Sequence, residues 1–229
     1  RNGKDVYCEK PESLTVREGR VMVETARRYG RVFSGGSQRV WEDYNWYHRM
    51  VWSGAAGELR EVFVNIGGPS GEMLCAAEPV PEGLDWDLWL GLAPWRPYNQ
   101  AYHPANWRGC RDYSGGGMTD WGAHHIGGAL FAAQLHDKPL PVEVIPPGKD
   151  DPNLTFVYAN GVVLEHKGGF GVDFFGTEGE VQVNRGRFTF RRGTEVIASF
   201  TGQRDTSCAA QVQRAEQEVD SMVAAAYRL

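Results

Sequence analysis

The stretch that decides the fold is GKDVYCEKPESLTVREGRVMVETARRYGRVF, residues 3–33. A short run of β-forming residues, Val6–Cys8, is followed by a helix-like pattern over residues 13–29 and by a second β-forming run at Arg31–Phe33. The order strand, helix, strand predicts two parallel strands joined by a crossover helix. We therefore expect the last part of an α/β unit whose earlier strands lie upstream of the quoted sequence.

The expected helix carries start and stop signals. Ser13 or Thr15 can cap its N-terminus, and Glu18 lies three residues after Thr15, which is the spacing of a capping box. Gly30 follows the pattern where a left-handed residue commonly ends a helix. The second β-forming run is then expected to end in a turn at residues 34–36, Ser-Gly-Gly.

The rest of the chain predicts a separate α+β domain. Strands are expected at residues 58–66 and in seven later segments: PVEVIP, LTFVYA, GVVLEHKG, GVDFFGT, EVQVNR, GRFTFRR and EVIASF. Ala-Asn-Gly at 159–161 predicts a hairpin between two of them. Helices are expected at residues 41–53, from Met118 to about Leu135, and at 209–229. This order of elements predicts a largely antiparallel, open sheet with helices on one face.

A long irregular stretch, residues 67–117, is rich in Gly, Pro and Trp. Loops of this length inside a compact domain are usually functional. All eight tryptophans lie in the stretch from Trp41 to Trp121. Such a cluster is typical of sugar-binding clefts, where aromatic faces stack on sugars, but large aromatic side chains also fill cores. Both interpretations stay open at this point.

Composition excludes several classes of function. The 229 residues are 41% hydrophobic and 23% charged, which is typical of a soluble globular protein. Because the net charge is −5 and there is no basic block or stripe, no nucleic-acid partner is expected. No apolar run approaches the roughly 20 residues that span a bilayer, so no membrane partner is expected either. The chain does not begin with methionine, which leaves the compartment open between the cytoplasm, the default, and the periplasm.

Lys10 is the first candidate site residue, because it stands where the first parallel strand ends. In open α/β sheets, ligands bind outside the carboxyl ends of the strands. A lysine there can hold a hydroxyl or carbonyl oxygen. Pro11 restricts Lys10 to an extended conformation and is compatible with a cis bond. The simpler alternative is a solvated loop lysine.

The second candidate site lies in SGGGMTDWGAHH, residues 114–125, where three glycines lead into the expected helix. Asp120 and His124 are four residues apart, so a continuous helix would place them on one face. A histidine beside a carboxylate can act as a general base that the carboxylate orients. A metal site from Asp120, His124 and His125 lacks a third ligand at suitable spacing, so no metal is expected.

These motifs closely resemble the Gfo/Idh/MocA family of NAD(P)-dependent oxidoreductases, over about residues 3–190. Residues 3–38 are similar to the end of the family's nucleotide-binding domain, whose E-K-P signature appears as Glu9-Lys10-Pro11. Residues 78–108 look like a bacterial branch of the family. The family pattern G-G-G-x-x-x-D-x-G-x-H, with one residue fewer before the aspartate, has its counterpart in Gly115, Gly116, Gly117, Asp120, Gly122 and His124.

The resemblance implies a fold in two parts. Residues 1–36 would be the C-terminal remnant of a truncated dinucleotide-binding (Rossmann) domain, and residues 37–229 a substrate-binding and oligomerisation domain. The cofactor would be NAD or NADP, with Glu9, Lys10 and Pro11 beside it, although the sequence contains neither G-x-G-x-x-G nor G-x-x-x-x-G-K-[ST]. The partner would be a second copy of the chain, bound through the antiparallel sheet.

The resemblance also implies a reaction, hydride transfer between NAD(P) and a secondary alcohol of a small sugar or polyol. Lys10 would contact the substrate hydroxyl, His124 would take its proton, and Asp120 would bind substrate or fix His124. Further substrate contacts are expected from Trp95, Arg96 and Tyr98. Two alternatives stay open: an NAD-dependent glycosidase that acts by transient oxidation and elimination, and a non-enzymatic module that binds sugar or forms oligomers.

Overall fold

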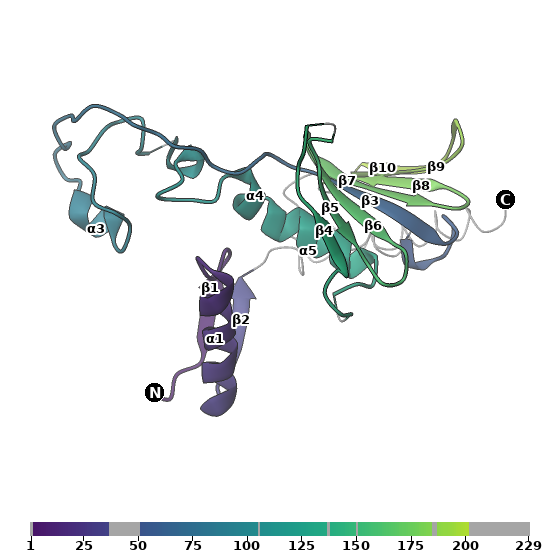
Figure 1. The fold of residues 1–229 in the computed structure, drawn as a ribbon, viewed down its shortest axis with the longest axis horizontal. Helices are drawn as coiled ribbons and strands as arrows, with labels where there is room; N and C mark the ends of the chain where they lie inside the picture. The colour runs from purple at the N-terminus through teal and green to yellow at the C-terminus, as the bar shows by residue number, and fades with distance from the viewer. Residues whose placement is uncertain are drawn as a thin grey trace. The chain divides into compact units, whose positions relative to one another are not determined.

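In the computed structural model the chain forms two compact units (Figure 1). One unit comprises Arg1–Gly36 and Gly67–Ala123, and the other comprises Ser37–Ile66 and His124–Leu229, so neither is contiguous in sequence. The structure describes residues 2–36, 51–104, 106–136, 138–149, 151–184 and 187–201. The expected helix at 209–229 and most of the one at 41–53 lie outside the described residues.

The first unit begins with the predicted strand–helix–strand motif. Strand β1 (Val6–Glu9) pairs in parallel with β2 (Phe33–Gly36), and helix α1 (Val16–Arg28) connects them. The crossover is therefore confirmed. The predicted bounds of the second strand were wrong, because it starts at Phe33 and continues through Ser-Gly-Gly, which we expected to turn. Glycine permits the close pairing of β2 with β1, because a Cβ on Gly36 would lie only 3.0 Å from the Cα of Glu9.

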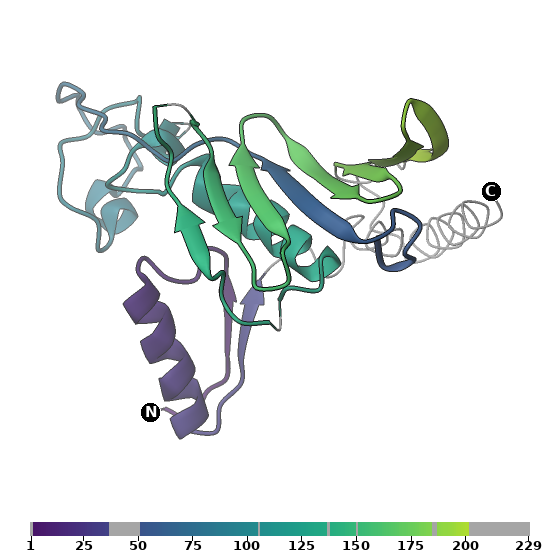
Figure 2. The same cartoon turned by 45° about the vertical axis from the view of Figure 1, so that its right-hand side comes forward.

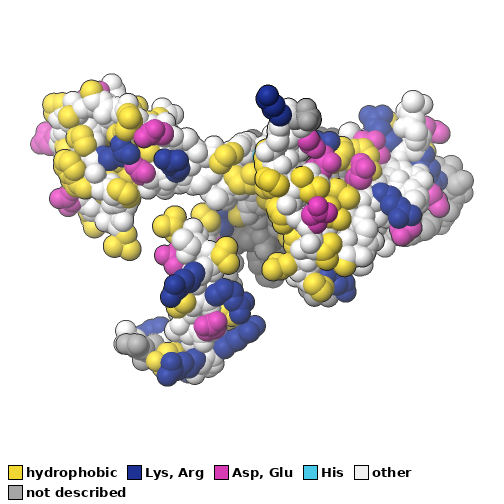
Figure 3. Space-filling view, in the orientation of Figure 1, with side chains coloured by type: hydrophobic (Ala, Val, Ile, Leu, Met, Phe, Trp, Pro, Cys, Tyr) yellow, Lys and Arg dark blue, Asp and Glu magenta, His cyan; other side chains and the backbone are white. Residues whose placement is uncertain are grey.

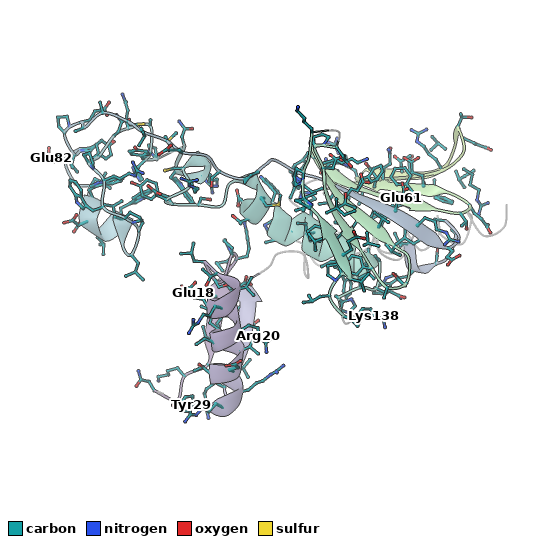
Figure 4. All side chains as sticks on the ribbon, in the orientation of Figure 1. Glu18, Arg20, Tyr29, Glu61, Glu82 and Lys138 are labelled. Carbon is teal, nitrogen blue, oxygen red and sulfur yellow. The ribbon has the colours of Figure 1, made fainter. Side chains whose placement is uncertain are left out.

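Helix α1 starts and ends at the predicted signals. Of the two candidate caps it is Thr15 that acts: its hydroxyl accepts from Glu18 N at 3.2 Å, and Glu18 Oε2 accepts from Thr15 N at 3.1 Å. This is a complete capping box. Gly30 follows the helix with φ of +58°, in the left-handed region. Figure 4 shows Glu18 near one end of α1 and Tyr29 near the other.

The irregular stretch, which we call the arm (residues 67–116), has a small core of its own. It contains one helix that was not predicted, α3 (Trp86–Leu90), and a 3₁₀ turn, η2 (Asn106–Gly109). Asp85 caps α3 by accepting a hydrogen bond from Leu88 N at 2.9 Å. Trp86 and Trp89 stack with ring centroids 4.7 Å apart. For these two tryptophans the core interpretation is therefore right. The buried members of the arm core are Trp86, Leu90, Tyr98, Tyr102 and Cys110.

The second unit contains, within its described residues, an eight-stranded sheet in the order β10-β9-β8-β7-β3-β6-β5-β4. Its strands are β3 (Leu59–Asn65), β4 (Glu143–Ile145), β5 (Leu154–Val157), β6 (Val163–Lys167), β7 (Gly171–Gly176), β8 (Glu180–Val183), β9 (Arg187–Arg192) and β10 (Glu195–Thr201). All neighbours are antiparallel except β3 and β6, so the predicted largely antiparallel sheet is confirmed. The predicted hairpin at 159–161 joins β5 to β6, and Gly161 has φ of +85°.

The sheet has one buried face and one partly exposed face. Along β3 the side chains of Val62 and Val64 are fully buried, whereas Phe63 between them is only half-buried. This is the alternation that a strand with one core face requires. Figures 1 and 2 show α5 against one face of the sheet, as predicted, and its Ala129 and Ala132 are buried.

The helix predicted from Met118 to about Leu135 is divided into two. α4 (Gly117–Asp120) ends before Trp121, and α5 (Gly122–Ala132) follows it. The prediction of one continuous helix was wrong here. Glycine costs about 1 kcal/mol relative to alanine inside a helix, so a break before Gly122 loses little helical stability.

Candidate functional site

The structure brings together Lys10 and Asp120, which are 110 residues apart in the sequence. Lys10 follows β1 directly, at the carboxyl end of that strand. Its Nζ donates to Asp120 Oδ1 at 2.6 Å and to the backbone carbonyl oxygen of Asp120 at 2.8 Å. The Lys10 side chain is only 15% exposed. Lys10 is therefore a fixed, charge-paired group at a strand end rather than a solvated loop lysine. Its bond to Pro11 is cis.

A second cation, Arg108, holds the other carboxylate oxygen of Asp120. Arg108 Nε donates to Oδ2 at 3.0 Å. Burial by itself would raise the pKa of Asp120, but the hydrogen bond and charge of Lys10, helped by Arg108, outweigh it and lower that pKa below its ordinary value of 3.8. Ionised Asp120 thus stabilises the fold above the ordinary pKa, and this contribution is lost as pH falls through the lowered value.

The glycine run before α4 fixes the position of Asp120. Gly116 has φ of +73°, and Gly117 packs against Gly67 so closely that a Cβ would lie 2.8 Å from the Gly67 Cα. Gly68 O accepts from Met118 N at 3.2 Å, and Ser70 N donates to Gly115 O at 3.3 Å. Because these contacts are between backbones, only glycine fits. They attach the start of α4 firmly to residues 67–70.

The predicted substrate contacts on the arm have different surroundings. The ring of Trp95 is 70% exposed and lines an open groove of about 700 Å³ together with Leu84 and Asp85. Arg96 forms an ion pair with Asp112, with Nε 2.6 Å from Oδ2. Tyr98 is buried in the arm core, edge-on to Trp86. Only Trp95 therefore offers a largely exposed face.

The remaining predicted residues are placed as follows. Glu9 and Pro11 are exposed on either side of Lys10 at the end of β1. His124 is buried on α5 and belongs to the second unit, so the structure does not group it with Lys10 and Asp120. Among the residues that the structure describes, no set of three or more His, Cys, Asp or Glu side chains could hold a metal ion. No helix in the described ranges is long and apolar enough to cross a membrane.

Sequence reasoning missed Arg108 and Asp112. Arg108 lies twelve residues before Asp120 in a 3₁₀ turn, and no helical or strand period relates the two positions. Asp112 is likewise separated from Arg96 by irregular backbone. The one available signal is composition, since Arg108 and Asp112 are charged residues four positions apart in a stretch that is otherwise rich in aromatic residues.

Residues 66–168 match the sequence model of the Gfo/Idh/MocA group that is described as "Oxidoreductase family, C-terminal alpha/beta domain". This segment belongs to the Gfo/Idh/MocA family. The resemblance inferred from the motifs is thereby confirmed, over a range that includes Asp120 and His124 and ends one residue after β6. Lys10 lies outside the matched range, and its ion pair with Asp120 links the strand-end residue to the Gfo/Idh/MocA segment. No curated protein sequence matches the chain.

Solved structures share this fold at low sequence identity. An aldose-aldose oxidoreductase from Caulobacter crescentus is 18% identical with a TM-score of 0.58, over 98% of this chain and 68% of that one. An NAD-binding protein from Listeria innocua is 18% identical with a TM-score of 0.52, over 96% and 66%. An oxidoreductase from Pseudomonas syringae is 11% identical with a TM-score of 0.55, over 98% and 59%. The chain thus spans about two thirds of their length or less, and the likeness establishes the fold.

Proposed function

We propose that the full-length protein transfers a hydride between NAD or NADP and a secondary hydroxyl of a sugar or polyol. The observation that carries this proposal is the Lys10–Asp120 ion pair at the carboxyl end of β1. Strand ends of parallel α/β sheets are where ligands bind. A half-buried ion pair that joins such an end to a Gfo/Idh/MocA segment is well suited to hold a substrate oxygen.

Lys10 binds the oxygen of the reacting carbon in this proposal. An ammonium group has three N–H donors, and within the described part of the chain two of its hydrogen bonds go to Asp120. The third donor serves the substrate oxygen. Its positive charge stabilises the negative charge that develops on this oxygen as the hydroxyl proton leaves. Asp120 keeps the ammonium at a fixed position and does not need to change protonation state.

Oxidation of a secondary alcohol releases a hydride and a proton, and the proton needs an acceptor. We assign that role to His124, because a neutral imidazole takes a proton near neutral pH. Trp95 provides an exposed aromatic face for a sugar, and the ion-paired Arg96 and buried Tyr98 hold the arm segment that carries it.

We also assign part of a nicotinamide-cofactor site to this chain. We assign residues 1–36 to the end of a dinucleotide-binding domain and residues 37–229 to the substrate domain, because β1, α1 and β2 form a parallel unit of the appropriate kind. Glu9, Lys10 and Pro11 at the end of β1 fit the nicotinamide side of the cofactor, whereas no phosphate-loop motif occurs in the 229 residues. When bound, the nicotinamide ring accepts or donates the hydride.

The direct test uses the full-length protein with NAD and with NADP against a panel of aldoses, uronates and polyols. We expect reduction of the cofactor, seen as absorbance near 340 nm, with a subset of these compounds. Cofactor binding without net redox turnover on any compound would contradict the proposal. If aglycone were released from a chromogenic glycoside without accumulation of reduced cofactor, the reaction would be that of a glycosidase.

We also propose that the partly exposed sheet face is a homo-oligomer interface. The ring centroids of Phe63 and Phe175 lie 4.7 Å apart at the centre of this face, and Lys167 Nζ lies 3.2 Å from the Phe63 ring centroid. Asn65 donates to Asp173 at 2.8 Å, and burial raises the pKa of Asp173 despite this bond. Figure 3 shows hydrophobic side chains mixed with acidic ones over the sheet. Aromatic side chains such as those of Phe63 and Phe175 are enriched at the centres of protein–protein interfaces, which supports this proposal.

Replacing Phe175 by glutamate is expected to convert the oligomer to a monomer. A charge at the centre of the face would be desolvated on association without a partner. Central hot-spot residues of an interface cost about 2 kcal/mol or more of binding free energy when they are lost. Light scattering during size-exclusion chromatography measures the mass. Val196→Glu, at a half-exposed position of the edge strand β10, is the matched control. An unchanged mass for Phe175→Glu, or a monomeric parent protein, would overturn this assignment.

A further inference from the structure

Arg108 is placed to control the orientation in which the Asp120 carboxylate binds Lys10. The two oxygens of the Asp120 carboxylate are shared between two cations: Oδ1 lies 2.6 Å from Lys10 Nζ, and Oδ2 lies 3.0 Å from Arg108 Nε. A carboxylate with only one cation can rotate and offer either oxygen. With a cation on each oxygen, its orientation is fixed.

The turn that carries Arg108 is itself well anchored. Gly71 bonds on both sides of Cys110: its N donates to Gly109 O at 3.0 Å, and its O accepts from Arg111 N at 2.8 Å. Cys110 is buried in the arm core. The Arg108 guanidinium also lies 4.6 Å from the ring centroid of Trp107, a cation–π contact. The Arg108 side chain is therefore held in place although it is 54% exposed.

We propose that Arg108 is a positioning residue: it binds Asp120 Oδ2 so that Oδ1 and the backbone carbonyl hold Lys10, and it gives the three-residue cluster a net positive charge. Lys10 and Asp120 alone would cancel each other. With Arg108 added, one positive charge remains to stabilise the negative charge on the substrate oxygen. Among the described residues, Lys10 at the end of β1 and Arg108 in η2 are the charged groups that interact with Asp120. The electrostatic part of this inference rests on the function proposed above, whereas the positioning part does not.

The positioning part is tested without substrate or cofactor, by NMR titration of the Asp120 carboxyl in the full-length protein. We expect Arg108→Gln to raise the pKa of Asp120, because the charge and hydrogen bond of Arg108 favour the ionised form. Arg108→Lys should return the pKa of Asp120 most of the way to its value in the parent protein. Arg111→Gln removes the same charge from an exposed arginine three residues away, and we expect it to leave this pKa nearly unchanged. An identical Asp120 pKa in Arg108→Gln and the parent would overturn the inference.

The functional part is tested by kinetics on a sugar that the parent protein oxidises. Loosened positioning of a catalytic group commonly costs about 10- to 100-fold in rate, so Arg108→Gln should lower kcat by that amount with little change in KM. Arg108→Lys should recover part of the lost kcat, and Arg111→Gln should keep the kcat of the parent. If Arg108→Gln shifts the Asp120 pKa but no sugar is oxidised by the parent, the proposed function fails and the positioning role stands. If the parent is active and Arg108→Gln keeps its full kcat, the inference alone fails.

Discussion

Replacing Lys10 with methionine is expected to lower kcat/KM of the full-length protein for its sugar by about 10²- to 10⁴-fold. Methionine keeps most of the length of the side chain but has neither charge nor N–H donor. The substrate oxygen would lose its hydrogen bond, and the developing negative charge would lose its nearest cation. Of its two cationic partners in the described part of the chain, Asp120 would keep Arg108 alone, so its pKa should rise. Steady-state kinetics with the parent's best substrate measures the effect.

The matched control for this substitution is Lys4→Met. Lys4 is an exposed lysine that precedes β1 on the same strand–helix–strand motif. Its loss removes the same formal charge without touching the Asp120 ion pair. We expect this variant to retain the kinetics of the parent. If Lys10→Met folds and binds cofactor normally but retains parental kcat/KM, then Lys10 does not contact the reacting oxygen.

Replacing Gly116 with alanine is expected to lower the free energy of unfolding by about 3 kcal/mol. The left-handed backbone at φ of +73° disfavours any side chain, and such strain costs on the order of 1–3 kcal/mol. The new methyl would also meet backbone atoms, with Pro69 C at 2.7 Å and Gly68 O at 2.9 Å. Backbone cannot move aside as a flexible side chain can, so overpacking adds a further cost of about 1 kcal/mol or more.

Urea denaturation of Gly116→Ala measures this change, with an unchanged slope as the sign that only stability has altered. Gly71→Ala is the control, since a Cβ there would have nothing within 4 Å. Because Gly116 begins the segment that carries Asp120, we also expect weaker docking of Lys10 in this variant. Equal stability of Gly116→Ala and Gly71→Ala would mean that the glycine run is not a structural requirement of the site.

Local signals made part of the fold predictable from the sequence. The Thr15–Glu18 capping box and the following Gly30 set the bounds of α1, because each acts over a few residues of chain. The hairpin at 159–161 and the buried–exposed alternation around Phe63 were predictable for the same reason. The second parallel strand was placed too early, because its position depends on hydrogen bonds to β1 and not on its own residues.

The candidate site was predictable in its members but not in its contacts. Lys10 and Asp120 were each identified by a motif, yet sequence spacing paired Asp120 with His124, whereas the structure pairs it with Lys10. That prediction assumed one continuous helix, and the chain breaks it at Trp121. Arg108 could not be found, because a 3₁₀ turn in irregular backbone follows no period that a sequence pattern reveals.

For the aromatic residues of the arm, composition likewise does not determine whether a side chain belongs to a core or to a binding surface. The tryptophan cluster was compatible with a sugar-binding cleft and with a core. In the structure Trp86 is buried against Tyr98, and Trp95 alone of the named substrate contacts is largely exposed. A tryptophan contributes as much area to a small core as to a binding surface. Only the packing of the arm, with its short helix α3, distinguishes the two uses.

The measurement that tests the central claim most directly is a crystal structure of the full-length protein with NAD(P) and the sugar that it oxidises best. We predict that the oxygen of the reacting carbon lies about 2.7–3.2 Å from Lys10 Nζ, within hydrogen-bond distance, while Lys10 remains bound to Asp120. A sugar whose reacting oxygen lies beyond hydrogen-bond distance of Lys10, or a Lys10 that has left Asp120, would contradict the account.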